Sequence, residues 1–258
     1  MESVNYWSLR TPAHIVFMID QSGYMFGSKA EIASKNVQNA IVDIILHCVN
    51  GEVVKRRAYI SVFGYGQKYT PVALIRNGWV DEWADDVFAA KQNGEYIIPP
   101  TSEWSSPVDK CFSMVYGHIN EWIKFQHEEQ KDYCFGLGPI LVINITDGVV
   151  EDKTKTSEIA TKIMESQNTW LFNILIPEEV GTDIILPNNK HCLNGIVIDH
   201  EIGFYYDISS TLTIHEDDVC RAECRGCEGV KSGSNIRGLI VSSNDKSASI
   251  ITGIMCHY

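Results

Sequence analysis

Two mainly apolar runs, each leading to an aspartate within two residues, constrain the fold of this chain more than any other feature. Ile15 to Ile19 leads directly into Asp20, and Ile140 to Ile145 leads through Thr146 into Asp147. Runs this short cannot cross a bilayer, and they fit strands that are buried on both faces of a parallel sheet. Open α/β sheets bind ligands at the carboxyl ends of their strands. Both aspartates are therefore expected at one binding edge.

The residues after the first run predict a strand, a loop and a helix in succession. Asp20, Ser22 and Gly23 follow where the chain leaves the sheet, and Ser28 to Glu31 has the pattern of a capping box that begins a helix. Apolar residues then recur at three- and four-residue spacing, and Gly51 can end the helix. These are Ile32, Val37, Ala40, Ile41, Ile44, Ile45 and Cys48. Asp20 and Ser22 should lie on the connecting loop.

The rest of the chain continues the alternation of strands and helices that is typical of an α/β fold. Pro107 suits the first turn of a helix, which makes Ser106 its expected N-cap. The segment from Ile184 to Ile198 has no clear pattern. Strands are expected over Ala58–Phe63, Pro71–Ile75 and Trp170–Ile176, and helices within Trp79–Gln92, from Pro107 to Ile123, and along the stripe of Ile159, Ile163 and Met164.

Composition and charge restrict the class of protein. The chain has 258 residues, of which 45% are hydrophobic, so it can bury the core of a single α/β domain over 1–258. Its formal charge of −12 argues against a nucleic-acid partner, because phosphate binding needs clustered Lys and Arg. No apolar stretch approaches the ~20 residues that span a bilayer, and the first residues do not resemble a secretion signal. We expect a cytoplasmic protein without a membrane partner.

The two aspartate motifs resemble those of the von Willebrand factor A (VWA) family. The metal-ion-dependent adhesion site of that family begins with Asp-x-Ser-x-Ser, and this chain has Asp20-Gln-Ser-Gly-Tyr24. A later Thr-Asp-Gly motif corresponds to Thr146-Asp-Gly148, and Ser106-Pro-Val-Asp-Lys-Cys-Phe112 resembles the threonine-containing loop between them. The resemblance covers about residues 14–210, and within the family the chain resembles compact bacterial VWA proteins of tellurite-resistance and related stress or conflict operons.

The resemblance implies a fold and a metal site. The fold would be a doubly wound, mostly parallel sheet with one antiparallel edge strand and helices on both faces. Its core would cover about residues 14–210, and the elaboration from about 211 to 258 would hold a closing helix, a loop and a final helix. Asp20, Ser22, Ser106 and Asp147 would hold Mg²⁺, or Mn²⁺ or Ca²⁺, through hard oxygen ligands. An Asp or Glu of a protein partner would complete the coordination.

Departures from the family pattern leave alternatives open. Tyr24 replaces the last serine of the first motif, and its phenol cannot occupy the position of a serine hydroxyl, so either water fills that position or the protein is a metal-free interaction scaffold. Thr101 is the alternative to Ser106 as the hydroxyl ligand, and Trp104 could join Tyr24 at the rim of the site. A phosphatase-like hydrolase is the outside alternative, because a nucleophilic Asp in that class needs a second Asp where Ser22 stands.

The cysteines and histidines suggest little further chemistry. Cys220, Cys224 and Cys227 have a spacing that could hold zinc, with His215, or an iron–sulfur cluster, but packing as small apolar residues is the preferred interpretation. We interpret five other cysteines as buried reduced thiols. We expect four histidines to be packed or exposed rather than catalytic. Without a nucleophile elbow or a P-loop, we expect no enzyme. The cysteines are Cys48, Cys111, Cys134, Cys192 and Cys256, and the histidines are His14, His47, His118 and His127.

Overall fold

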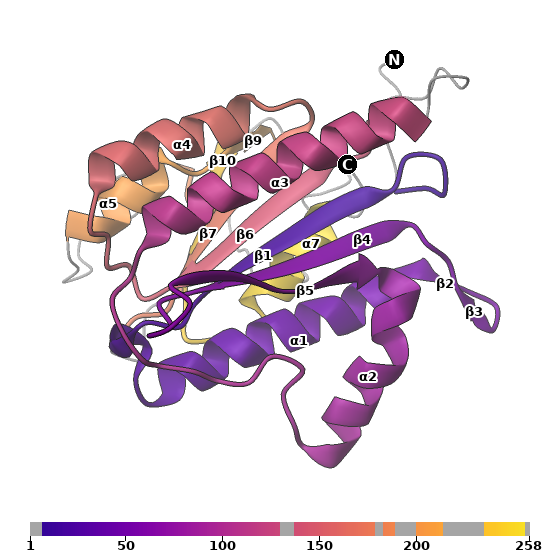
Figure 1. Ribbon diagram of the computed structural model, residues 1–258, viewed down its shortest axis with the longest axis horizontal. Coiled ribbons are helices and arrows are strands. Elements are labelled where there is room, and N and C mark those ends of the chain that lie inside the picture. Colours follow the sequence, from indigo (N-terminus) through magenta and orange to yellow (C-terminus); the bar gives the residue numbers. More distant parts are fainter. Residues whose placement is uncertain (1–6, 130–136, 179–182, 189–199, 214–234, 256–258) are drawn as a thin grey trace.

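A seven-stranded sheet runs through the computed structural model, which describes residues 7–129, 137–178, 183–188, 200–213 and 235–255 (Figure 1). The strand order is β5-β4-β1-β6-β7-β11-β8. Pairing is parallel from β4 to β11, and both edge strands, β5 and β8, are antiparallel to their neighbours. The bounds are β1 Ala13–Asp20, β4 Ala58–Tyr65, β5 Val72–Trp79, β6 Ile140–Thr146, β7 Thr169–Leu175, β8 Ile184–Ile185 and β11 Leu239–Val241.

The two apolar runs form neighbouring central strands, as predicted. Every residue of β1 and every residue of β6 is buried, because helices cover both faces of the sheet. The strands pair in parallel from His14 with Ile140 to Ile19 with Ile145. Their carboxyl ends therefore lie side by side.

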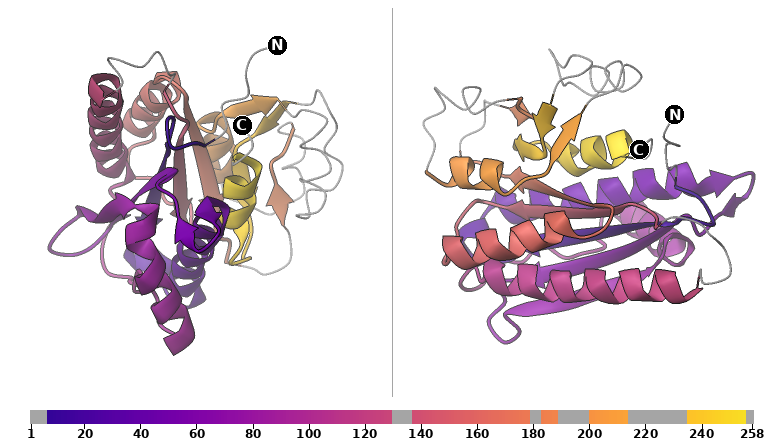
Figure 2. Two further views of the ribbon diagram at one scale, coloured as in Figure 1. Left: turned by 90° about the vertical axis from the view of Figure 1, so that its right-hand side faces the viewer. Right: turned by 90° about the horizontal axis from the view of Figure 1, so that it is seen from above.

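Helices pack on both faces, which confirms the doubly wound α/β fold (Figures 1 and 2). One apolar core lies between the sheet and α1 Ser28–Cys48, α2 Val80–Asn93 and α7 Ser247–Met255. The other lies between the sheet and α3 Val108–Glu129, α4 Lys153–Glu165 and α5 His200–Asp207. Within the described residues, no helix combines the length and the apolar character needed to cross a bilayer.

The antiparallel edge forms as predicted, but it is longer. β5 pairs with β4 from Val72 to Trp79, with a register shift between Val62 and Phe63, and α2 begins directly at Val80. The second antiparallel edge strand, β8, has two residues and carries no periodicity that a sequence pattern could show. Two small antiparallel pairs also occur in the described residues: β2 Val49–Asn50 with β3 Val53–Val54, and β9 Thr211–Thr213 with β10 Asn235–Arg237.

Two expectations about α1 were wrong. The helix begins at Ser28, but its N-cap is Gly27, at φ 65°, and no side chain caps it. Ser28 lies inside the helix, where its hydroxyl cannot reach the first free N–H groups, so Ser28 and Glu31 form no capping box. The helix ends at Cys48, and Gly51, also at φ 65°, instead occupies the turn between β2 and β3.

The C-terminal segment contributes to the central layers. β11 pairs in parallel with β7 inside the main sheet, and α7 packs against α1 in the same apolar core. Asn36 of α1 ties the two helices: its Oδ1 accepts the Ala248 N–H at 2.9 Å and its Nδ2 donates to the Asn244 carbonyl at 3.0 Å. The final helix expected in the tail corresponds to α7, and β9, β10 and β11 precede it. The closing helix expected after residue 210 stays a prediction, because residues 214–234 lie outside the described part of the chain.

Candidate functional site

The parallel pairing of β1 and β6 brings residues that are far apart in sequence to one edge of the sheet. Thr146 is the last residue of β6, and its hydroxyl donates to Asp20 Oδ2 at 2.8 Å. Asp147 follows at once. The first and second aspartate motifs therefore meet at the carboxyl edge, as the sequence predicts.

The Asp20 carboxylate is buried and accepts three hydrogen bonds. The Ser22 N–H donates to Oδ1 at 2.9 Å, and the hydroxyls of Ser106 and Thr146 donate to Oδ2 at 3.1 and 2.8 Å. The pKa of Asp20 is raised from 3.8 to about 6. Burial is the largest cause and the nearby charge of Asp147 adds to it, while hydrogen bonds from Ser22 and Thr146 act in the opposite direction. Desolvation outweighs the hydrogen bonds. A cation beside Asp20 would stabilise its charged form.

Ser106 and Ser22 present oxygens to the same place. The Ser106 hydroxyl, just before α3, donates a hydrogen bond to the Asp20 carboxylate, which leaves the lone pairs of the Ser106 oxygen for another ligand. Ser22 Oγ is buried and has no hydrogen-bond partner among the described residues. A buried hydroxyl left without a partner is uncommon and points to an absent ligand. Both residues fit a site for a hard cation.

Asp147 has a cationic neighbour that the sequence did not reveal. Its Oδ1 accepts the Val149 N–H at 3.2 Å, and its Oδ2 lies 3.5 Å from the Lys29 ammonium. Both side chains are almost buried, with 6% and 10% exposed. Lys29 also lies 3.6 Å from a carboxylate oxygen of the exposed Glu178. Lys29 lies in the first turn of α1, and nothing in the sequence distinguishes it from a lysine exposed to solvent.

The loop before α3 is fastened to the Asp20 loop by backbone bonds. The Gly23 N–H donates to the Trp104 carbonyl at 2.7 Å, and the Trp104 N–H donates to the Gly66 carbonyl at 2.9 Å. Ser102 Oγ donates to the Ser22 carbonyl at 3.1 Å. Thr101 does not join the site, since its hydroxyl bonds to the Pro99 carbonyl at 3.3 Å. Of the two rival residues, the structure brings Ser106 to Asp20.

Exposed aromatic side chains surround this edge. Tyr24, Phe26 and Trp104 are 50%, 63% and 58% exposed, and the first two lie on the same short loop between β1 and α1. Lys68 lies over both the Trp104 and the Tyr69 rings, at 5.6 and 5.3 Å from their centroids. Large rings left in water beside buried polar groups are typical of a contact surface.

The ligand set fits a hard cation and no softer metal. Asp20, Ser22, Ser106 and Asp147 offer carboxylate and hydroxyl oxygens, which suit Mg²⁺ or Mn²⁺. No group of three or more His, Cys, Asp or Glu in the described part of the chain is placed to hold a metal. The site would therefore depend on its two hydroxyls, and on water, in addition to its two carboxylates.

The other predicted residues divide between packed and exposed positions. Cys48 and Cys111 are buried free thiols, and His14 is buried while His127 is exposed. His47 lies exposed near the end of α1. Outside the described residues are the zinc candidates Cys220, Cys224, Cys227 and His215, together with Cys134, Cys192 and Cys256.

Comparisons with known proteins identify the fold alone. No protein-family model and no curated protein sequence matches this chain. A solved structure of proximal thread matrix protein 1 from the mussel byssus is similar at a TM-score of 0.51 and 10% identity, covering 95% of this chain and 47% of that one. Manganese-loaded TRAP from Plasmodium vivax is similar at a TM-score of 0.41 and 18% identity, covering 64% of this chain and 57% of that one. Human COPII-coat protein Sec24c is similar at a TM-score of 0.41 and 10% identity, covering 66% of this chain and 26% of that one.

The architecture is a VWA-like α/β fold with a polar site at the carboxyl edge of its sheet. The chain spans about half the length of the mussel and TRAP chains, so their activities are not transferred to it. The finer resemblance to compact bacterial VWA proteins stays a prediction.

Proposed function

We propose that this chain is a protein-interaction module that binds an acidic side chain of its partner through a divalent cation at the carboxyl edge of the sheet. One observation carries the proposal. Asp20, Ser22 and Ser106 converge from two separate loops, and the buried Ser22 hydroxyl is left without a partner among the described residues. A cation there would satisfy that hydroxyl and stabilise the ionised Asp20.

The residues of the site would have separate roles as metal ligands and as groups that orient a ligand. Asp20, Ser22 and Ser106 would hold Mg²⁺, Mn²⁺ or Ca²⁺, with Asp147 contributing directly or through water. Thr146 would keep the Asp20 carboxylate oriented, since its hydroxyl already donates to Oδ2. The bound ion would supply the local positive charge that an acidic partner needs on a chain of formal charge −12.

The exposed rings would add affinity beyond a single ion-mediated bond. Tyr24, Phe26 and Trp104 stand half or more exposed around the site, and aromatic residues dominate the binding energy of many interfaces. Because the rings need no metal, their contribution would survive chelation. Binding of a partner should therefore have one metal-dependent part and one aromatic part.

A displayed library of random peptides tests the proposal, because selection from it requires no partner to be chosen in advance. Selection on the immobilised chain should enrich peptides with an Asp or Glu when Mg²⁺ is present. Chelation should remove the metal-dependent part of their binding and the preference for Asp or Glu, and so should Asp20→Asn. Asp85→Asn, an exposed carboxylate on α2, removes the same charge and should leave the selection unchanged.

A metal-free scaffold is the second candidate, and the Lys29–Asp147 pair favours it. In that case the ammonium supplies the positive charge that the ion would otherwise supply. Peptides enriched equally with Mg²⁺ and with chelator, and lost on Tyr24→Ala but kept on Asp20→Asn, would establish this candidate and overturn the metal bridge.

A further inference from the structure

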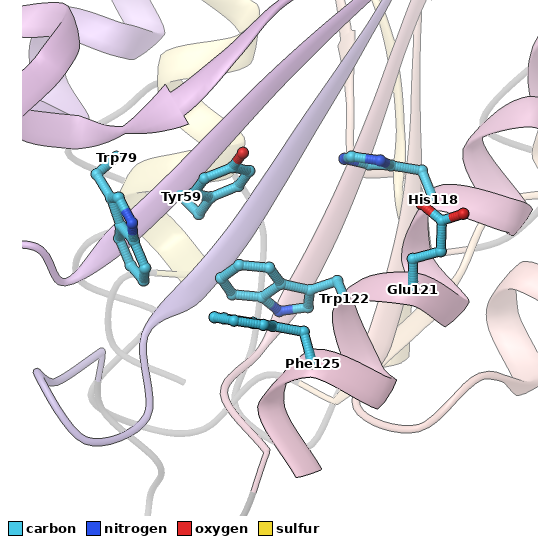
Figure 3. A pocket seen from close by; sticks show the side chains of 6 residues that line it. All are labelled: Tyr59, Trp79, His118, Glu121, Trp122 and Phe125. Carbon is cyan, nitrogen blue, oxygen red and sulfur yellow. The ribbon is translucent and has the colours of Figure 1, made fainter. Parts of the chain in front are cut away.

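An aromatic pocket lies at the opposite end of the sheet from the Asp20 site. It has a volume of about 240 Å³ and is lined by Tyr59, Trp79, His118, Glu121, Trp122 and Phe125 (Figure 3). Tyr59 is near the start of β4 and pairs with Trp79 at the end of β5. His14, which contacts Trp122, and Asp20 are six residues apart on β1, so about 20 Å separates the two sites.

Four rings form the walls of the pocket. The Trp122 ring stacks on Tyr59 at 5.0 Å between centroids and lies 5.8 Å from Phe125, which places it between the two (Figure 3). Trp79 stands at 83° to Tyr59 and at 60° to Trp122. Rings at steep angles present π faces in more than one direction. Such a corner suits a cation, which is attracted by the negative face of an aromatic ring.

The charges around the pocket favour a positive ligand. Glu121 is exposed at its mouth and forms no ion pair with any described residue. The guanidinium of Arg56 lies 6.0 Å from the Trp79 ring, but Asp81 and Glu82 bind it at 2.9 and 3.1 Å. Glu121 is therefore the only carboxylate or ammonium among the residues that line the described pocket.

The buried polar groups next to the pocket wall are uncharged. Ser61 Oγ lies within hydrogen-bond distance of both rings, at 3.0 Å from His14 Nε2 and 2.9 Å from His118 Nε2. Burial lowers the pKa of both histidines, most strongly that of His14. Neither imidazole repels a cation near neutral pH.

One buried donor in the pocket wall has no acceptor. Trp122 is 7% exposed, and its Nε1–H makes no hydrogen bond within the described residues. A ligand that carries an oxygen beside its cationic group could satisfy this donor. The volume, below the roughly 300–1,000 Å³ of pockets for drug-sized compounds, suits a molecule of few atoms.

We propose that this pocket binds a small organic cation, namely a quaternary or methylated ammonium compound with a nearby oxygen. The aromatic walls of the pocket would surround the cationic group, and Glu121 would balance its charge. This second site is independent of the metal site at the other edge.

Choline and its neutral isostere 3,3-dimethylbutan-1-ol test the proposal, because they share shape and hydroxyl and differ in charge. Each is titrated into the whole chain while the fluorescence of its tryptophans and the heat of binding are followed. Choline should bind at least roughly tenfold more tightly than the isostere, given the strength of a desolvated cation–π contact. Equal binding of the two, or no binding of choline at millimolar concentration, would overturn the proposal.

Two charge-matched variants locate the site. Glu121→Gln should weaken choline binding several-fold and leave the isostere unaffected. Glu158→Gln removes an exposed carboxylate from α4, changes the net charge equally and should leave both ligands unaffected. Both residues are exposed, so neither change should disturb folding. A loss of choline binding that is the same in the two variants would mean general attraction to an acidic chain and would contradict a built site.

Discussion

The ammonium of Lys29 lies 3.5 Å from Asp147 Oδ2, in contact with one of the two carboxylates of the candidate metal site. The Asp20 carboxylate, by contrast, receives hydrogen bonds from neutral groups only among the described residues. The two aspartates thus differ in what balances their charge. Lys29 is expected to compete with a bound ion for Asp147 and to leave Asp20 as the stronger ligand.

Replacing the competing cation should tighten metal binding. Lys29→Met removes a positive charge from the site, so the affinity for Mn²⁺ should rise roughly threefold or more, since even exposed ion pairs contribute up to ~1 kcal/mol. Lys35→Met, on the exposed side of the same helix, is the control. Calorimetric titration measures both. An affinity that falls on Lys29→Met would mean that the lysine supports the ion instead of competing with it.

Tyr24 should limit the strength of the site. Tyr24→Ser supplies the hydroxyl that the VWA pattern has at this position, and the stabilisation by Mg²⁺ in a thermal scan should increase, because a ligand of the native state stabilises by RT ln(1 + [L]/Kd). Tyr24→Ala removes the same ring without adding a ligand. If both variants give the same shift, the ring and not the missing hydroxyl limits metal binding.

The stabilisation by metal should depend on pH with a defined sign. The folded pKa of Asp20, about 6, lies above its unfolded value of 3.8. The stability that Asp20 contributes is therefore fully present below about 3.8 and is lost as the pH rises through about 6. A metal binds the ionised form, so it should restore stability above that pH and add little at about pH 5, where it must displace a proton.

Thermal unfolding in metal-free buffer and in buffer with Mn²⁺, compared at each pH from about 5 to about 7.5, isolates this effect. Groups away from the metal contribute equally to both scans and cancel in the difference. The increment from Mn²⁺ should grow with pH through about 6. An increment that is constant, or that is largest at the acidic end of the range, would exclude Asp20 as the main ligand.

Gly66 should control the position of the Ser22 loop. It has φ +103°, and a Cβ there would lie 2.5 Å from Ser22 N and 2.7 Å from Ser22 Cα. Gly66→Ala should destabilise the fold by more than ~1 kcal/mol and should also abolish the shift caused by Mg²⁺. Gly117→Ala, in α3 with open space around it, should be neutral or stabilise by roughly 0.5–1 kcal/mol. Chemical denaturation measures both, and intact metal binding in Gly66→Ala would contradict the role of the loop.

The sequence predicts the central strands and the meeting of the two aspartate motifs well, because both depend on two apolar runs that end in polar residues. β1 and β6 are fully buried, and their ends bring Asp20 and Thr146 into contact. Ser106 could be predicted only as a helix cap or, by resemblance, as a ligand. Its bond to Asp20 follows from tertiary packing of the loop before α3.

Short elements and long side chains could not be predicted in the same way. β8 and β11 have two and three residues, which is too few for a periodic signal, and their place in the sheet depends on pairing across the chain. Lys29 resembles a solvated lysine until the structure places its ammonium beside Asp147. The pocket at the other edge combines residues of two strands and one helix. In the sequence, the aromatic residues of each of these elements look like ordinary core residues.

The most direct test of the metal site is the number of Mn²⁺ ions bound per chain, measured by equilibrium dialysis at a fixed free concentration. Wild type and Asp85→Asn should each bind one ion, and Asp20→Asn should bind none at the same free Mn²⁺. Absence of Mn²⁺ from the wild type at millimolar concentration, or undiminished binding in Asp20→Asn, would contradict the account.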